Sequence, residues 1–203
     1  MIKIAFVGRK HSGKSTAACF AEAALMNKGF DPRAESFAAP IKRMREAFLE
    51  STGIAYDGIN DKETPMTALP GRPSIRSIEQ TIGTEWGRWL IHPDIWLAHM
   101  ELRLTATRAD AVVIDDVRFR NELEWCRTHG FSVVWIQRPT SDRDSHPSEQ
   151  ELERMVPEND EPVIHNDGTI EMLEDRVNHL IDLLLDPIEP RDTPDPDLSI
   201  SGP

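Results

Sequence analysis

Cysteine and long apolar runs are scarce in this sequence of 203 residues. The two cysteines, Cys19 and Cys126, lie far apart without CxxC or Cys/His spacing, which argues against a disulfide framework and a structural zinc site. We expect both to be buried thiols. No apolar run approaches the roughly 18 residues of a membrane-spanning helix, and the first run, Ile2 to Val7, is too short for a signal peptide. We therefore expect a cytoplasmic protein with no membrane partner.

Positive charge is also in short supply. Lysine and arginine number 23 against 35 aspartates and glutamates, so the net charge is −12. A surface this acidic repels a phosphate backbone, and we expect no nucleic-acid polymer as a partner. Any anionic ligand must be held by a local cluster of positive groups.

The remaining composition is that of a globular protein. Apolar residues make up 39% and charged residues 29%, which excludes a disordered chain and a fibre. The length is that of one domain with some additional residues. The additional residues are 187–203, which hold five of the fifteen prolines and four acids against one base. We expect one domain over 1–186 and a disordered, acidic, proline-rich tail over 187–203.

Apolar periodicity divides the domain into alternating strands and helices. We expect strands at 2–7, 33–37, 111–114, 131–136 and 162–165, and helices at 14–28, 40–50, 74–90, 94–107, 121–129 and 170–184. Residues 51–73 are rich in Gly, Pro, Asp and Thr and are expected to leave the sheet. Residues 138–160 are polar, with a short helix announced by the capping-box spacing Ser148-Glu-Gln-Glu151. This alternation predicts a three-layer α/β domain whose parallel sheet binds ligands at its carboxyl edge.

One motif between the first strand and the first helix carries most of the functional information. Residues 8–15, Gly-Arg-Lys-His-Ser-Gly-Lys-Ser, match G-x-x-x-x-G-K-[ST] in the required strand-to-helix context. In such a loop, backbone N–H groups converge on phosphate oxygens at the positive end of the helix. The lysine reaches the β- and γ-phosphates and the Ser15 hydroxyl binds Mg²⁺. The expected ATP-binding residues are Gly8, Lys10, His11, Ser12, Gly13, Lys14, Ser15 and Thr16.

A nucleotide site also needs an acid at the end of a neighbouring strand. The run Ala111-Val-Val-Ile-Asp-Asp116 supplies two. Strand alternation sends Asp115 and Asp116 to opposite faces, so we expect one of them to serve Mg²⁺. We assign this role to Asp116, and the choice between the two stays open.

Several segments, in order along residues 2–182, resemble the bacteriophage-type deoxynucleoside monophosphate kinases of the P-loop nucleoside monophosphate kinase group. Besides the P-loop they are Ser36-Phe-Ala-Ala-Pro-Ile-Lys42, Arg76-Ser-Ile-Glu-Gln-Thr-Ile-Gly-Thr-Glu85, His92-Pro-Asp-Ile-Trp96, Asp116-Val-Arg-Phe-Arg-Asn-Glu122, Ser145-His-Pro-Ser-Glu149 and Asn166-Asp-Gly168. The resemblance implies a five-stranded parallel sheet, a lid over about 138–160, and transfer of the ATP γ-phosphoryl group to a deoxynucleoside monophosphate. It also implies a homodimer and, for a phage-encoded protein, the host cytoplasm. Asp115 departs from the family, where a small or polar residue is expected.

Transfer between two phosphates requires alignment and charge neutralisation rather than a strong general base. The planar guanidinium group suits this task, because it contacts two phosphate oxygens at once. We expect catalytic roles for Lys14, Arg118, Arg138 and Arg143, the last two from the lid. No histidine is given a catalytic role.

The acceptor nucleotide should lie between the second strand and the 51–73 excursion. The expected substrate-binding residues are Phe37, Lys42, Arg43, Arg76, Gln80, Glu85 and Arg88. The resemblance implies that Arg76 and Arg88 clamp the acceptor phosphate, while Gln80 or Glu85 reads base edges. Three tryptophans, Trp86, Trp89 and Trp96, are expected in the core or, as an alternative, stacked on a base.

Two other functions stay open at this point. One is a different P-loop small-molecule kinase, such as a dephospho-coenzyme A kinase. The other is a protein that binds ATP as a switch and transfers nothing. The sequence does not determine which base is accepted, whether ribose is rejected, or the oligomeric state.

Overall fold

A central parallel sheet organises the computed structural model, which describes residues 1–54, 62–139, 151–152, 154–158 and 160–185. Its strands are β1 (Ile2–Val7), β2 (Pro32–Glu35), β3 (Ala111–Val117), β4 (Ser132–Gln137) and β5 (Val163–His165). Their order across the sheet is β2-β3-β1-β4-β5, and every neighbouring pair is parallel. The predicted five-stranded α/β fold is therefore confirmed.

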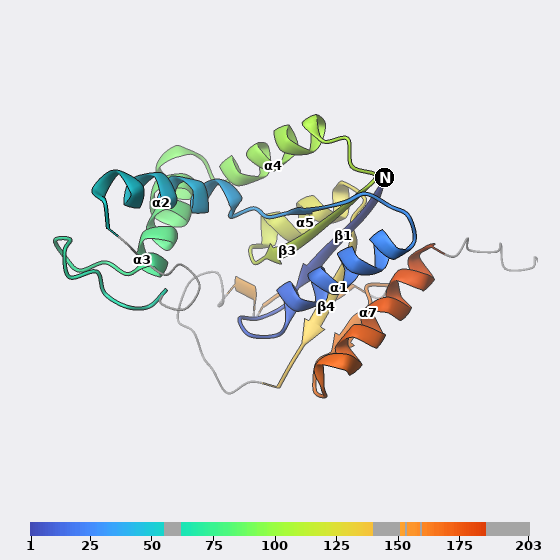
Figure 1. Cartoon of the computed structure of the whole chain (residues 1–203). Helices are drawn as coiled ribbons and strands as arrows, with labels where there is room; N and C mark the ends of the chain where they lie inside the picture. Colours follow the sequence, from blue (N-terminus) through green and yellow to red (C-terminus); the bar gives the residue numbers. More distant parts are fainter. Residues whose placement is uncertain (55–61, 140–150, 153, 159, 186–203) are drawn as a thin grey trace, which may run out of the picture.

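Helices cover both faces of this sheet (Figure 1). On one face α1 (Lys14–Asn27) and α7 (Ile170–Leu185) pack against Ile4 and Phe6 of β1. On the other face α4 (Ile95–Ala106) and α5 (Arg120–Thr128) share a core with Ala5 and Val7. A strand covered on both sides needs mostly apolar residues, which explains the almost continuous apolar run of β1, interrupted only by Lys3 near its start.

The chain leaves the sheet between β2 and α4. This part contains α2 (Ala39–Thr52), α3 (Ile75–Gln80) and η1 (Thr81–Ile91), which extend beyond one end of the sheet in Figure 1. Helix α3 begins with a capping box, in which the Ser74 hydroxyl accepts the Ser77 N–H at 3.1 Å and the Ser77 hydroxyl accepts the Ser74 N–H at 2.9 Å. The predicted excursion, residues 51–73, falls within this part of the chain, and residues 55–61 of it lie outside the described residues.

The helix predicted over 74–90 is observed, but its second half has a different winding. From Thr81 the backbone forms a π-helix of 11 residues, η1, although π-helical segments are usually a single turn. Gly87 allows Trp96 of α4 to approach η1, because a Cβ at this position would lie 2.3 Å from the indole ring. The indole Nε1–H donates to the Gly83 carbonyl at 2.8 Å. The close contact with Trp96 therefore requires glycine at position 87.

Some predictions about single residues are corrected. Cys126 is buried as expected, but Cys19 is exposed. Trp96 lies in the core, whereas Trp86 and Trp89 are 40% and 68% exposed because they lie on the outer side of η1. No helix in the described ranges is long and apolar enough to cross a membrane.

Two predicted segments fall largely or wholly outside the described residues. The tail, 187–203, and most of the proposed lid lie outside them. The start of the short helix predicted from Ser148 also lies outside, but Glu151 and Leu152 are described and helical. Where the chain is described again, Glu151 accepts the Arg120 N–H at 2.8 Å and Leu152 is buried with the α5 core. Residues 151–152 of the proposed lid segment therefore lie against α5.

Candidate active site

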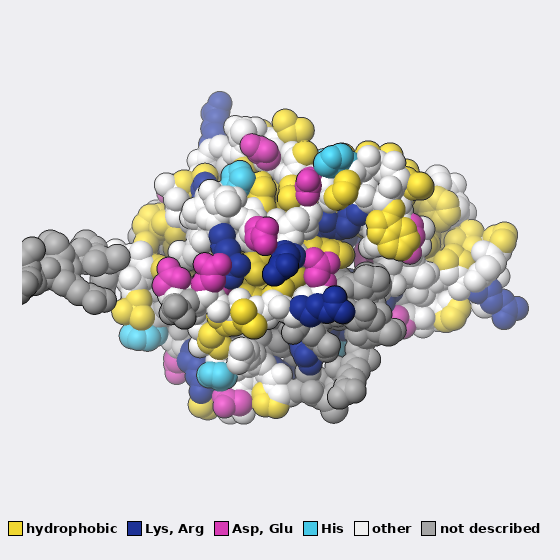
Figure 2. All heavy atoms as spheres, turned by 180° about the vertical axis from the view of Figure 1, so that it is seen from behind, with side chains coloured by type: hydrophobic (Ala, Val, Ile, Leu, Met, Phe, Trp, Pro, Cys, Tyr) yellow, Lys and Arg dark blue, Asp and Glu magenta, His cyan; other side chains and the backbone are white. Residues whose placement is uncertain are grey.

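A cavity of about 610 Å³ opens at the carboxyl edge of the sheet. Its walls come from the P-loop, the start of α2, the end of β3, and the helices α3 and η1. The face in Figure 2 has acidic and basic side chains interspersed, so the positive groups there form no continuous patch. In a chain of net charge −12, an anion must rely on the few cations that line this cavity.

The P-loop joins β1 to α1 and is shaped by its two glycines. A Cβ on Gly8 would lie 2.4 Å from the Ile136 carbonyl oxygen, and Gly13 has a φ of +99° that favours glycine. His11 also has a positive φ, of 62°. Helix α1 starts directly after Gly13, so its first N–H groups, which have no partner within the helix, stand beside the loop. This is the geometry of an anion-binding helix N-terminus.

Lys14 lies at the mouth of this loop and is only 6% exposed. Its ammonium group donates to the carbonyl oxygens of Gly8 at 2.5 Å and Arg9 at 2.7 Å. The positive charge is thereby held over the loop, where a bound phosphate chain would lie.

The structure brings most of the predicted ATP-binding residues to the same cavity. Its lining includes Lys10, His11, Gly13, Lys14, Ser15 and Thr16. Ser12 instead lines a second hollow of about 310 Å³ behind the P-loop, together with Arg9, Gln137, Arg138 and His165. Gly8 lines neither the main cavity nor the second hollow, and its contribution is to let the loop pass close to Ile136.

The two acids that end β3 have different surroundings. Both oxygens of Asp116 accept hydrogen bonds, from the Ser36 hydroxyl at 2.7 Å and from the backbone N–H groups of Phe37 and Ala38 at 2.9 Å each. Asp115 lines the cavity with Ser15, and its charge adds to burial in raising the pKa of Glu22 on α1. Asp116 therefore binds the start of α2, and Asp115 lies on the α1 side.

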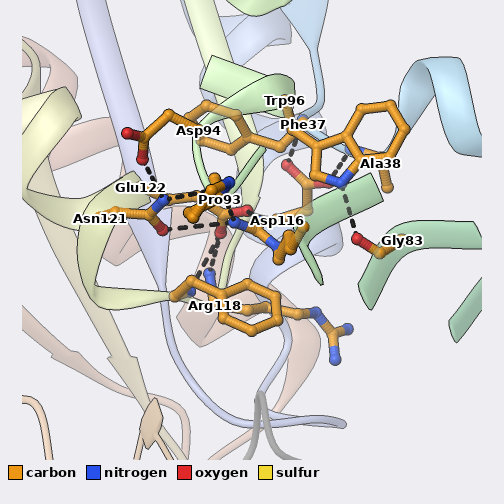
Figure 3. A network of polar contacts seen from close by, with 12 residues as sticks. Phe37, Ala38, Gly83, Pro93, Asp94, Trp96, Asp116, Arg118, Asn121 and Glu122 are labelled. Carbon is orange, nitrogen blue, oxygen red and sulfur yellow. Dashed lines mark hydrogen bonds and ion pairs between the residues drawn. The ribbon is translucent and has the colours of Figure 1, made fainter. Parts of the chain in front are cut away.

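A buried ion pair connects η1 to the first turn of α5, where Glu122 lies (Figure 3). Arg88 and Glu122 are 8% and 3% exposed, and an Arg88 Nη2–H donates to Glu122 at 2.5 Å. The guanidinium also donates to the Pro93 carbonyl at 3.1 Å and stacks 3.9 Å above the Phe119 ring centre. The other Glu122 oxygen accepts the N–H groups of Arg118 at 2.8 Å and Phe119 at 3.0 Å.

Burial raises the pKa of Glu122 to about 7. Arg88 and the two backbone donors favour the ionised form, and the charge of Asp116 disfavours it. Arg88 lines the cavity, but its guanidinium is engaged with the protein itself. This arrangement does not support the predicted clamp on the acceptor phosphate, because the planar face lies on Phe119 and the Nη groups already have acceptors.

Of the other predicted substrate-binding residues, some line the cavity and some do not. The cavity lining includes Phe37, Lys42, Arg76 and Gln80. Arg76 forms an ion pair with Glu63, and Lys10 of the P-loop lies 3.6 Å from the same carboxylate. Arg43 and Glu85 do not line the cavity, because they lie on the outer sides of α2 and η1.

Two of the three predicted catalytic arginines reach the site. Arg118 and Arg138 line the cavity, and Arg138 also borders the second hollow. Arg143 lies outside the described residues.

Several lining residues were not predicted from the sequence. They are Ile41, Lys62, Glu79, Gly83, Thr84, Phe119 and Glu122. Gly83 and Gly87, four residues apart in an otherwise helical pattern, were the one available signal of a close approach. No pattern in the sequence indicates the π-helical winding of the segment that carries Gly83 and Thr84. No group of three or more His, Cys, Asp or Glu side chains in the described part of the chain is arranged to hold a metal.

The chain is similar to known proteins over much of its length. A family model described as deoxynucleotide monophosphate kinase matches residues 50–177. A putative deoxynucleotide monophosphate kinase of Acanthamoeba polyphaga mimivirus is 33% identical over 196 residues, covering 90% of this chain and 97% of that protein. The deoxynucleoside-5'-monophosphate kinase of Escherichia phage T5 is 37% identical over 84 residues, covering 37% of this chain and 34% of the phage protein. Among solved structures, the APS kinase of Mycobacterium tuberculosis in complex with AMPPNP and APS gives a TM-score of 0.46 at 16% identity, covering 90% of this chain and 97% of that one.

Proposed function

This chain belongs to the deoxynucleotide monophosphate kinase family, and we propose that it transfers the γ-phosphoryl group of ATP to a deoxynucleoside monophosphate. The products are ADP and a deoxynucleoside diphosphate. The observation that carries the proposal is one cavity lined by a P-loop, the acid-bearing end of β3, and the helices α2, α3 and η1. Such a cavity has a phosphate-binding wall for the donor and a separate wall for the acceptor.

The donor is assigned to the P-loop side. The N–H groups at the start of α1 and the Lys14 ammonium would hold the β- and γ-phosphates. The second hollow begins at Ser12 and continues to Arg138 and His165, so it would take the donor nucleoside. This placement puts the γ-phosphate in the main cavity, facing α2 and η1.

Magnesium is assigned to Ser15 and Asp115 rather than to Asp116. Hydroxyl and carboxylate oxygens are the donors that Mg²⁺ prefers. Ser15, Asp115 and Asp116 all line the cavity, and Asp115 is the acid whose charge acts on Glu22 of α1. Asp116 already accepts three hydrogen bonds from the start of α2. The bound ion would neutralise charge on the β- and γ-phosphate oxygens.

The acceptor is assigned to the wall formed by Phe37, Lys42, Arg76, Gln80 and Thr84. Of these, Arg76 is the cation for the acceptor phosphate, which would replace Glu63 as its partner. The acceptor phosphate is already ionised at neutral pH, so the reaction needs in-line alignment more than proton removal. Arg118 and Arg138, which also line the cavity, would stabilise charge in the transition state.

A homodimer, implied by the family resemblance, stays a prediction. Trp89, Leu90 and Ile91 are 68%, 76% and 52% exposed at the end of η1 and are the apolar residues we assign to the contact. The molar mass from light scattering tests this for the wild type, Trp89→Ser and Leu90→Ser. We expect a dimer for the wild type and a weakened dimer for the variants, and a monomeric wild type contradicts the prediction.

The proposed activity is tested by coupling ADP release to a panel of acceptors with Mg·ATP. The panel contains the four deoxynucleoside monophosphates, the four ribonucleoside monophosphates, dephospho-coenzyme A, and a control without acceptor. We expect turnover with at least one deoxynucleotide and little ADP release without an acceptor. Phosphorylation of dephospho-coenzyme A alone, or tight ATP binding without transfer to any acceptor, would overturn the proposal.

A further inference from the structure

The loop after β5 contacts the P-loop from outside the main cavity. Asn166 in this loop is 8% exposed. Its backbone N–H donates to the Gln137 carbonyl at the end of β4 at 2.7 Å. Its side-chain Nδ2–H donates to the Ser12 carbonyl at 2.8 Å, across 154 positions of sequence. The phosphate-binding loop, which follows the central strand β1, is thus tied by a buried hydrogen bond to the loop after the edge strand β5.

This hydrogen bond determines which way one peptide group of the P-loop faces. In a planar trans peptide, the Ser12 carbonyl and the Gly13 N–H point in opposite directions. A donor that holds the carbonyl towards Asn166 therefore turns the Gly13 N–H away from Asn166. Gly13 lines the main cavity, whereas the carbonyl is on the side of β5. The N–H is thereby aimed to where a phosphate oxygen is expected.

The packing leaves little room for another arrangement. A Cβ built on Gly13 would lie 2.4 Å from Asn166 Nδ2 and 3.6 Å from Leu173. Glycine at position 13 is thus required for two reasons: the positive φ and the close approach of the Asn166 side-chain amide. A carboxylate in place of the amide would be an acceptor facing an acceptor, because an ionised aspartate has no hydrogen to donate.

We propose that Asn166 is a positioning residue for the donor phosphates, which orients the Ser12–Gly13 peptide so that its N–H can bind the phosphate chain. The inference rests on the proposed function only in taking the P-loop ligand to be ATP or ADP. The inference adds Asn166 to the donor site, a residue that has no role in the proposed function above. The residue acts through the backbone and does not touch the reacting atoms.

The decisive experiment measures the affinity of Mg·ADP by calorimetry, which needs no turnover. Asn166→Asp keeps the size of the side chain and replaces its donor by an anion, and we expect the dissociation constant to rise about 10- to 100-fold. Asn166→Ala removes the donor without adding charge, and we expect a rise of about 5- to 20-fold. Asn27→Asp, the same change at the exposed end of α1, should leave the affinity within twofold of the wild type.

Two further readouts separate positioning from general stability. The affinity for the accepted deoxynucleoside monophosphate, measured alone, should change less than twofold in the folded variants. In the wild type, the Asn166 side-chain amide protons should exchange with solvent far more slowly than those of exposed Asn27, a test that requires no variant.

Three results would overturn the inference. They are ADP affinity within twofold of the wild type in either folded Asn166 variant, equal loss of affinity for ADP and the acceptor, and fast exchange of the Asn166 amide. If wild-type ADP binding is normal but no deoxynucleotide is phosphorylated, the proposed function fails while the role of Asn166 can still be tested.

Discussion

The carboxylate of Asp116 accepts the backbone N–H of Phe37 at 2.9 Å, which ties the end of β3 to the start of α2. The residue at the N-cap position of α2, Ala38, has no side chain able to cap the helix. Asp116 takes over this task by accepting the Ala38 N–H and the Ser36 hydroxyl as well. The position of Phe37 in the acceptor wall therefore depends on an acid 79 residues further along the chain.

Substitution of the two neighbouring acids should have different consequences. Asp116→Asn removes part of the cap, and we expect the free energy of unfolding to fall by about 1–2 kcal/mol and the KM for the deoxynucleotide to rise. Asp115→Asn should leave the unfolding free energy within about 0.5 kcal/mol, while much more Mg²⁺ is needed for half-maximal turnover. Urea titration and magnesium titration of activity measure the two effects. An unchanged magnesium requirement in Asp115→Asn would return the metal role to Asp116.

Lys14 is the cation nearest to the expected phosphates, and Lys14→Met keeps most of its volume while removing the charge. We expect turnover to fall about 10²- to 10³-fold, because charge on the transferred group loses its partner. The Gly8 and Arg9 carbonyls also lose a donor, at a cost of about 1–2 kcal/mol in the free energy of unfolding.

The control for this prediction is Lys28→Met at the far end of α1. Lys28 forms an ion pair with Asp182 at the surface, so its loss should leave turnover unchanged. Steady-state kinetics under saturating Mg·ATP make the comparison. Turnover of Lys14→Met close to that of Lys28→Met would show that the P-loop lysine does not serve the reaction.

Arg88 can be tested as a structural residue through its partner. Arg88→Met leaves Glu122 buried without its cation, and we expect a loss of about 3–5 kcal/mol in the free energy of unfolding. In the double variant with Glu122→Gln, the uncompensated charge is gone and part of the stability should return. Chemical denaturation of the wild type, both single variants and the double variant measures the coupling. Additive effects of the two substitutions would contradict a direct interaction.

The same glutamate predicts a pH dependence of stability. The pKa of Glu122 is raised from 4.5 to about 7 in the folded protein, so the folded state binds the proton more tightly than the unfolded state. Its contribution to stability is complete below about pH 4.5 and is lost as the pH rises through about 7. We expect wild-type stability to fall by up to about 3 kcal/mol over this range relative to Glu122→Gln. If the free energies of unfolding of the wild type and Glu122→Gln change in parallel between pH 5 and 8, the pKa of Glu122 is not raised.

The strands of the sheet were predicted well because each can be recognised from the residues of its own segment. A continuous apolar run, as in β1, requires no knowledge of the partners that cover it. The ends of the strands were less accurate: β2 ends at Glu35 instead of Phe37, because Asp116 draws Ser36 and Phe37 into hydrogen bonds. This contact joins residues that periodicity along one segment cannot relate.

The donor half of the site was better predicted than the acceptor half for the same reason. The P-loop is a contiguous motif whose spacing encodes its geometry. The acceptor wall depends on which side of α2 and η1 faces inward, which the sequence does not reveal. The predicted Arg43 and Glu85 do not line the cavity, whereas their neighbours Ile41 and Thr84 do. The role of Asn166 arises only when β5 is placed beside β4, after which its amide reaches Ser12.

The π-helical winding of η1 makes the acceptor wall sensitive to chain length. Each turn holds more residues than an α-helical turn and closes an i→i+5 hydrogen bond. Deleting one residue between Thr81 and Ile91 would let the segment relax to ordinary winding, but it would also rotate Thr84 and Arg88 relative to Gln80 of α3. Insertions and deletions in η1 are therefore a route to new acceptor preferences that leave the P-loop half of the enzyme untouched.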